Sequence, residues 1–221
     1  MMKLTLITQP LKSFRTVFLF LSLFYLLTGL NSSYAQTTVD SGTQQNPKQL
    51  VINITQKFAS LSAEQRHALL QSSTAQQDFI RTHLLPYFAQ RQMAQYVMGA
   101  HWRNASEQQR QDFQTALMDN LVNNYSANLF RVPIEFIKIK KVFHPKNRRA
   151  EIETQIGLQN GASQPLKYRA LQSQHDDQWY LYDFSFNNIS ALVTLQTLYK
   201  PLIQFKGLDS VITQLRSGAT F

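Results

Sequence analysis

The chain has 221 residues, no cysteine, seven glycines and a formal net charge of +9 at pH 7. The absence of cysteine excludes a disulfide framework, a thiol nucleophile and a thiolate metal site, and so few glycines argue against nucleotide-binding loops. No G-x-S-x-G, H-E-x-x-H or dinucleotide-binding motif occurs in the sequence. The excess of positive charge favours anionic partners, such as phospholipid headgroups or an acidic protein surface.

The N-terminal residues have the organisation of a secretory signal peptide. Three basic residues precede an apolar run over residues 17–30, and Ser33, Tyr34 and Ala35 then form a small-x-small cleavage site. We expect cleavage after Ala35, which removes residues 1–35 and lowers the formal net charge to +6. An uncleaved anchor is the alternative, but about fourteen apolar residues are few for a spanning helix, which needs about twenty. We therefore expect a periplasmic protein, for which nucleic acid is not a partner.

The chain between residues 47 and 129 has the apolar periodicity of helices. Residues 36–46 are polar and aperiodic, and we interpret them as a mobile leader. A first amphipathic helix opens near Pro47, and Ser62 with Gln65 forms a capping box that starts a second. The apolar residues that repeat at helical spacing in these segments are Leu50, Val51, Ile54, Phe58, Leu61, Ala68, Leu69, Leu70, Phe79, Ile80 and Leu84.

Residues 84–129 are the most informative stretch of the chain. Pro86 lacks the backbone donor that a continuing helix needs, and Gly99 is a plausible left-handed helix stop. Ser106 and Gln109 form a second capping box, after which a long helix is expected. The apolar face of this long helix consists of Phe113, Leu117, Leu121, Tyr125 and Leu129, with Met118 and Val122 beside them.

Alternation of apolar and polar residues begins after Pro133 and predicts four strands. The predicted strands cover residues 134–142, 150–158, 166–170 and 179–186. Because short turns connect them, one of them at Asn160-Gly161, we expect an antiparallel meander. Residues 189–202 and 208–215 return to helical spacing and are expected to pack back onto the sheet. The order of elements predicts an α+β fold, a single domain over residues 47–217 with helices on one face of one sheet.

Six short motifs occur in a fixed order along the chain. They are LLPYF at residues 84–88, M-A-x-x-V-M-G-x-x-W-R-x-A-S-x-x-Q-R at 93–110, F-x-x-x-L-x-x-x-L-x-x-x-Y at 113–125, WYLYD at 179–183, NIS at 188–190 and KGLD at 206–209. No single motif is a catalytic signature, and the specificity lies in their order. This order resembles the MlaC family, whose members are periplasmic phospholipid-binding proteins.

The resemblance implies a curved, mainly antiparallel four-stranded sheet and a helical layer that together enclose a deep apolar cavity. It further implies a soluble carrier that binds a glycerophospholipid by its acyl tails and maintains the lipid asymmetry of the outer membrane. The implied partners are an outer-membrane lipoprotein–porin complex and an inner-membrane ABC transporter with an MCE-domain component. The phospholipid is cargo, and the resemblance implies no enzymatic step, no cofactor and no metal.

The expected lipid-binding residues are apolar or aromatic and come from both layers of the fold. Core packing is the default interpretation of any one of them, because periodicity alone does not distinguish a filled core from a hollow one. The set comprises Leu85, Met93, Tyr96, Val97, Leu117, Leu121, Tyr125, Phe136, Ile152, Ile156, Tyr168, Tyr182, Phe184, Ile189 and Leu192.

Two other functions compete with lipid transport. Asp183 lies in an aromatic strand and, beside Tyr180 or Tyr182, could act as the general base of a pocket enzyme of the ketosteroid-isomerase type. The interpretation that we favour is that Asp183 pairs with a neighbouring donor or caps the next segment. The second alternative is a periplasmic chaperone for lipidated proteins, which would present an open apolar groove.

Charged and titratable residues give few further functional signals. The densest basic cluster consists of Lys138, Lys140, Lys141, His144, Lys146, Arg148 and Arg149. It could dock onto anionic headgroups or an acidic protein, but we favour a solvated strand face whose lysines protect a sheet edge. The five histidines show no metal-ligand spacing and are His67, His83, His101, His144 and His175.

Overall fold

The computed structural model describes residues 46–131, 134–159 and 161–218. The predicted signal peptide, with its cleavage after Ala35, lies outside the described residues, and so does the predicted leader except for Asn46. Within the described ranges, no helix is long and apolar enough to cross a membrane.

The N-terminal helices begin where polar side chains cap them. Helix α2 (Pro47–Ala59) starts at Asn46, whose side chain accepts a hydrogen bond from the backbone N–H of Gln49 at 2.8 Å. Helix α3 (Ala63–Gln71) starts at the predicted capping box, in which Ser62 and Gln65 exchange hydrogen bonds of 2.8 and 3.1 Å. Helix α4 (Ser73–His83) and the 3-10 helix η1 (Leu85–Tyr87) follow.

The central stretch forms three helices, of which two have the predicted stop at Gly99 and the predicted start at Ser106, while the short helix between them was not predicted. Helix α5 (Gln90–Met98) ends at Gly99, which has a φ of 57° and satisfies the helix end without steric strain. Helix α6 (His101–Asn104) leads to the second capping box, formed by Ser106 and Gln109 with hydrogen bonds of 3.0 and 3.1 Å. The long helix α7 (Glu107–Arg131) then begins as predicted.

The sheet has five antiparallel strands in the order β1-β2-β3-β4-β5. The strands are β1 (Ile134–Phe143), β2 (Arg149–Leu158), β3 (Ser163–Gln172), β4 (Trp179–Phe186) and β5 (Ile189–Ser190). We expected four strands, and the structure has a fifth, the short strand β5. Asn187 and Asn188 have φ values of 48° and 63°, which gives the tight hairpin turn that folds β5 back onto β4.

Of the two C-terminal helices, α8 (Ala191–Lys206) packs against the sheet as predicted, whereas α9 (Leu208–Arg216) packs mainly against α7 and α8. One boundary also differs from the prediction. Residues 189–190 belong to β5, so helix α8 begins after them and not at residue 189. The hydroxyl of Ser190 caps this helix by accepting the N–H of Val193 at 3.0 Å. Helix α9 follows after Gly207.

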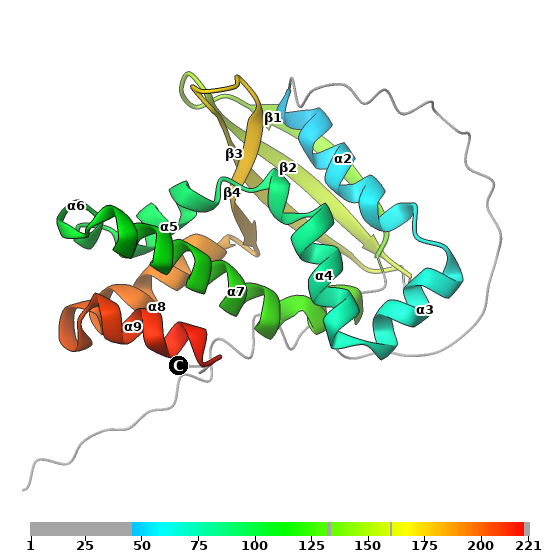
Figure 1. Cartoon of the computed structure of the whole chain (residues 1–221). Helices are drawn as coiled ribbons and strands as arrows, with labels where there is room; N and C mark the ends of the chain where they lie inside the picture. The colour runs from blue at the N-terminus through cyan, green and yellow to red at the C-terminus, as the bar shows by residue number, and fades with distance from the viewer. Residues whose placement is uncertain (1–45, 132–133, 160, 219–221) are drawn as a thin grey trace, which may run out of the picture.

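The helices cover the sheet unequally (Figure 1). Helix α2 crosses one face, which we call the inner face; the opposite face is the outer face. Helices α5 and α8 pack beside strand β4, and α7 packs mainly against α4, α5 and α9. We call the part formed by α5 to α9 the helical end, and the part formed by the sheet with α2 and α4 the sheet half.

Each part has its own apolar core. In the helical end, a cluster of buried residues joins helices α5 to α9 around Phe113 and Leu117. In the sheet half, Leu50 and Val51 of α2 pack onto the inner face, and a smaller group joins α2, α4 and α7. Phe88 contacts both main clusters, and Ala89 donates its N–H to the carbonyl of Leu181 at 2.8 Å. The segment after η1 therefore joins the two parts at strand β4.

Candidate lipid-binding site

The register of the strands decides which side chains share the inner face. Tyr168 on β3 lies opposite Ile152 on β2 and opposite Phe184 on β4. Residues directly opposite each other in an antiparallel pair project from the same face. Because Ile152 packs under α2, Tyr168 and Phe184 also project toward the helices. The same reasoning places Ile156 on this face, two residues beyond Thr154.

Burial differs along the inner face. Residues under α2 are almost completely covered, including Ala150, Ile152, Ala170 and Leu181, none of which is more than 1% exposed. Farther along the strands, five apolar residues on the same face remain only half-buried: Ile137, Ile156, Leu166, Phe184 and Phe186. Since these side chains face the helical layer and yet retain accessible surface, protein atoms do not fill all the space in front of them.

The environment of Tyr168, in the middle of the inner face, is the most informative about this region. Burial raises the pKa of its phenol, because a phenolate at this position would be far from bulk water. Even so, part of the side chain is not covered by protein atoms. Within the described ranges its hydroxyl has no hydrogen-bond partner. Tyr168 is therefore surrounded by protein but not sealed by it.

Helix α2 does not seal against the edge strand. A pocket of about 140 Å³ lies between them, with Val51 and Thr55 of α2 on one side and Ile137 and Ile139 of β1 on the other. This volume is smaller than the roughly 300 Å³ at the lower end of small-molecule pockets. The pocket by itself is too small for a lipid, but it marks an incompletely packed seam at the boundary of the inner face.

An aromatic cluster closes the region between α2, α4 and α7. The ring centroids of Phe58 and Phe79 lie 5.7 Å apart, and those of Phe79 and Phe130 lie 5.5 Å apart. Tilted and edge-to-face pairs at these distances are favourable. Ile80, Leu84 and Val122 form the buried centre of this group. The helical side of the region is therefore apolar, as the inner face is.

The fifteen predicted residues fall into three groups by their environment. Five are packed in the two main cores, namely Met93, Val97, Leu117, Ile152 and Leu192. Seven are half-buried, namely Leu85, Leu121, Tyr125, Ile156, Tyr168, Tyr182 and Phe184. Three are exposed, namely Tyr96, Phe136 and Ile189. Of the whole set, the inner face brings Ile152, Ile156, Tyr168 and Phe184 together.

Two predicted residues lie on the outer face. A β-bulge between β3 and β4 leaves Tyr182 without a direct partner, and its ring lies under Arg149, whose Cζ is 4.9 Å from the ring centroid. Phe136 lies opposite Gly157, and a Cβ built on this glycine would be 2.1 Å from the Phe136 ring. The aromatic ring thus lies over the glycine and away from the inner face.

Asp183 has a structural role that the sequence analysis favoured. Its side chain is 1% exposed and accepts hydrogen bonds from Arg169 at 3.1 Å and from the hydroxyl of Ser190 at 2.7 Å. Its other oxygen accepts the backbone N–H of Leu192 at 2.9 Å. Asp183 therefore pairs with a donor on β3 and caps the start of α8. A carboxylate with three donors is poorly suited to remove a proton from a substrate.

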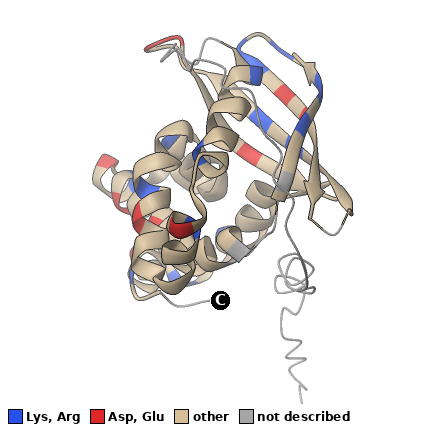
Figure 2. Cartoon of the chain, turned by 90° about the vertical axis from the view of Figure 1, so that its right-hand side faces the viewer, with Lys and Arg blue, Asp and Glu red and all other residues tan. Residues whose placement is uncertain are grey.

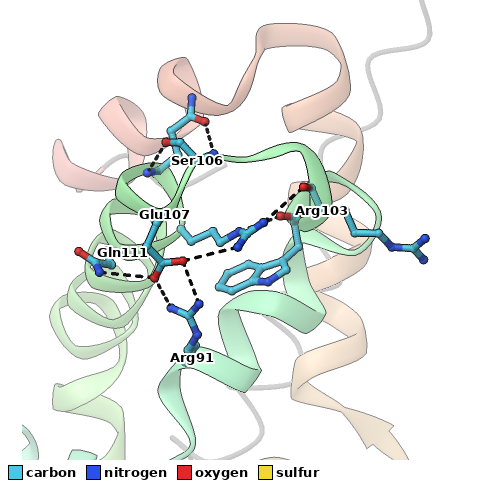
Figure 3. A network of polar contacts seen from close by, with 8 residues as sticks. Arg91, Arg103, Ser106, Glu107 and Gln111 are labelled. Carbon is cyan, nitrogen blue, oxygen red and sulfur yellow. Dashed lines mark hydrogen bonds and ion pairs between the residues drawn. The ribbon is translucent and has the colours of Figure 1, made fainter.

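Two motif residues of the central stretch, Trp102 and Arg110, take part in a polar cluster with their neighbours, which we call the clasp. Arg91 donates two hydrogen bonds to Glu107, at 2.7 and 3.0 Å, and Figure 3 shows Gln111 approaching the same carboxylate. The guanidinium carbons of Arg91 and Arg110 lie 5.2 and 5.3 Å from the centroid of the Trp102 ring. The clasp joins α5, α6 and the start of α7 and leaves these charged groups engaged with one another.

The described residues contain no group of histidines and carboxylates that could hold a metal ion. The ring of His83 lies tilted against that of Phe79, with ring centroids 4.8 Å apart, and the ring of His144 meets that of Trp179 edge-on, with centroids 5.8 Å apart. These two histidines are packing residues on the aromatic edges of the sheet half.

Most of the chain matches the model of one known family. The family model described as MlaC protein matches residues 53–217. The chain belongs to the MlaC family. The match spans all of the sheet, both C-terminal helices and most of the N-terminal helical segment, so it covers the inner face as well as the helical end.

A solved structure has the same fold as this MlaC family member. It is the phospholipid-binding protein from Ralstonia solanacearum, in complex with a phospholipid. The two chains share 18% sequence identity, and the alignment covers 80% of this chain and 97% of the other with a TM-score of 0.65. At this level of identity the likeness establishes the shared MlaC fold, an α+β architecture with an antiparallel sheet.

Sequence reasoning missed several residues that line the same inner face. Ile137, Leu166 and Phe186 share the exposure and orientation of Ile156. From α2, Ile54 packs against the core under that helix, and both Ile54 and Phe58 pack against Ile80, Leu84 and Val122. A signal for the strand residues was present, because Leu166 alternates with polar neighbours as Tyr168 does. The partners on α2 could be identified only from the packing of helix on sheet.

Proposed function

We propose that the protein is a periplasmic carrier that binds a glycerophospholipid by its acyl tails. The tails would occupy the space between the inner face of the sheet and helices α2, α4 and α7. The observation that supports this best is Tyr168, which lies deep in the fold and yet is incompletely covered. Membership of a family with a phospholipid-bound structural relative supports the same ligand class.

The chemistry of the inner face suits hydrocarbon. The half-buried residues next to Tyr168 on the inner face are aliphatic or aromatic. On the same face, the hydroxyl of Thr154 donates to the carbonyl of Leu166 at 2.7 Å. A satisfied hydroxyl does not compete for a polar ligand. An apolar tail gains the burial of its methylene groups against the aliphatic and aromatic side chains of this surface.

Magnitudes explain why a carrier is needed for such a ligand. At about 0.8 kcal/mol per buried CH₂, a sixteen-carbon tail gains roughly 12 kcal/mol on leaving water. Two tails would reach the practical ceiling near −21 kcal/mol for noncovalent binding, so release into water is negligible. Transfer to another apolar environment costs little, because the tail stays out of water throughout. Partners that open the protein during contact are therefore part of the proposal.

The proposed partners are an outer-membrane lipoprotein–porin complex and an inner-membrane ABC transporter with an MCE-domain component. Transfer between them would maintain the lipid asymmetry of the outer membrane. The carrier performs no covalent step in this proposal. The carboxylate of Asp183, the candidate general base, already accepts three hydrogen bonds within the protein. The proposal also includes the predicted export signal, with cleavage after Ala35.

Native mass spectrometry of the exported protein tests the proposal. We expect the wild-type protein to carry phospholipid in a defined stoichiometry. The variant Ile156→Trp places a large ring in the proposed tail space and should lose most of the bound lipid while remaining folded.

A matched control comes from the neighbouring position on the same strand. Gln155 projects to the outer face, where its amide donates to Ser163 at 2.6 Å. The variant Gln155→Trp should keep its lipid, because its new ring points away from the tail space. A wild-type protein without any lipid, or equal lipid on both tryptophan variants, would contradict the proposed site.

A further inference from the structure

The outer face carries a second, chemically different pocket. It has a volume of about 370 Å³ and lies where helix α5, the β1–β2 turn and strands β2, β3 and β4 meet. This volume falls within the range of roughly 300–1,000 Å³ for small-molecule sites. Its walls include the rings of Tyr96 and Tyr182 and the amide of Gln92. The inner face described above lies on the other side of the sheet.

The pocket is positively charged. Three cations line it, namely Lys146, Arg149 and Arg169, against the single carboxylate of Glu151. Figure 2 shows basic and acidic bands crossing the strands of the sheet. The formal charge of the lining is therefore +2.

Only part of this charge is neutralised within the protein. Arg169 donates to Glu151 at 3.3 Å and to Asp183 at 3.1 Å, so its charge is compensated by carboxylates on the two neighbouring strands. Lys146 and Arg149 form no ion pair with any side chain of the described residues. Two cations without a carboxylate partner thus face the same pocket.

The local structure holds these two cations together. The N–H of Arg149 donates to the carbonyl of Lys146 at 3.1 Å, which closes the turn between β1 and β2. Within this turn Arg148 has a φ of 59°, and its guanidinium pairs with Asp177 at 2.7 Å. The Arg149 guanidinium lies over the ring of Tyr182. An arginine stacked on an aromatic ring keeps the edge of its planar fork free for an anion.

We propose that this outer pocket binds a phosphate group. A phosphate monoester carries about −1.5 to −2 charges at pH 7, which matches the charge of the lining. The fork of Arg149 fits two phosphate oxygens, and Lys146 supplies a second charge beside it. The volume leaves room for a small organic group on the phosphate, against the two tyrosine rings.

Isothermal titration calorimetry with inorganic phosphate and with sn-glycerol 3-phosphate tests this site on the whole purified protein. We expect the ester to bind, and Arg149→Gln to weaken it by about tenfold or more, as the loss of a charge-assisted hydrogen bond implies. Lys146→Gln should act in the same direction by a smaller factor. Since Lys146 is an exposed turn residue, this variant tests the site even if Arg149→Gln is unstable.

The matched control is Lys138→Gln. Lys138 is an exposed lysine on strand β1 that does not line the pocket, so its loss lowers the net charge equally. Ester affinity should be unchanged in this variant. Equal weakening by all three substitutions, or no binding of either probe by the wild type, would overturn the proposal.

Vesicles that contain phosphatidic acid, whose headgroup is a phosphate monoester, distinguish a membrane source of the phosphate from a soluble one. If wild-type protein sediments with vesicles, if Arg149→Gln does not, and if glycerol phosphate competes, the group belongs to a lipid headgroup at a membrane surface. If the ester binds, but wild-type protein and Arg149→Gln sediment with vesicles to the same extent, the ligand is a soluble phosphate ester. Either result is independent of tail binding, because the two sites lie on opposite faces of the sheet.

Discussion

The helical end and the sheet half contain similar apolar side chains but cover them to different degrees. Phe113 and Leu117 in the helical end are completely buried, whereas Phe184 and Ile156 in the sheet half are only half-buried although they face the helices. A close-packed core supports a fixed shape, and a loosely filled one leaves room for a guest. The comparison separates the close-packed part of the protein from the incompletely filled part, where we propose that the lipid tails bind.

The strongest test of this difference removes one phenylalanine from each part. Phe113→Ala should destabilise the protein by about 3–5 kcal/mol, because it leaves a cavity in a close-packed core. Phe184→Ala should cost about 1 kcal/mol, since a half-covered ring loses only part of the transfer free energy of full burial. Urea unfolding of lipid-free protein measures both, because bound lipid would itself stabilise the folded state. Equal losses would show that the two parts are packed alike.

A second test concerns the junction between the two parts, where Asp183 joins β3 and β4 to α8. Asp183→Asn weakens the pairing with Arg169 and should cost about 2 kcal/mol, allowing for the partial exposure of Arg169. Lipid occupancy in native mass spectra should not change, since Asp183 projects away from the inner face. The exposed pair of Arg148 and Asp177 provides a control, and Asp177→Asn should cost less than about 1 kcal/mol. A catalytic role would require a lost turnover at unchanged stability.

The smallest expected effect is the pH dependence of the clasp in the helical end. The hydrogen bond from Arg91 lowers the pKa of Glu107 below its ordinary value of 4.5. A carboxylate with a lowered pKa stabilises the fold above its ordinary pKa, and this contribution is lost as the pH falls through the folded value. The small stability difference between wild type and Glu107→Gln at pH 7 should therefore shrink at pH 3. A difference that persists at pH 3 would rule out the charge of Glu107 as its origin.

Local sequence signals predicted most of the secondary structure. The two capping boxes at Ser62 and Ser106 contain their own hydrogen-bond partners three residues away, so the chain itself encodes these helix starts. Strict alternation encodes β2 and β3 in the same way. Strand β5 was not predicted, because the turn before it is made by two asparagines in a left-handed conformation, which the periodicity of apolar residues does not reveal.

The candidate site was predictable only where neighbouring strands are in simple register. Ile156 and Tyr168 lie on adjacent strands without an intervening bulge, and alternation put both on the inner face. Tyr182 has the same parity as Phe184 in the sequence, but the bulge turns it to the outer face. Val97 and Leu117 lie in the filled core of the helical end. Helical periodicity predicts that such residues are buried, but it does not distinguish burial by protein from burial by a ligand.

The contact between Phe136 and Gly157 restricts which amino-acid substitutions these two positions of the sheet can accept. Any side chain at residue 157 would meet the ring 2.1 Å away, so the ring would have to swing out into water. A smaller residue at position 136 would remove that conflict but uncover the backbone of β2. The two positions are thus energetically coupled, and substitutions there should be accepted in pairs more readily than singly.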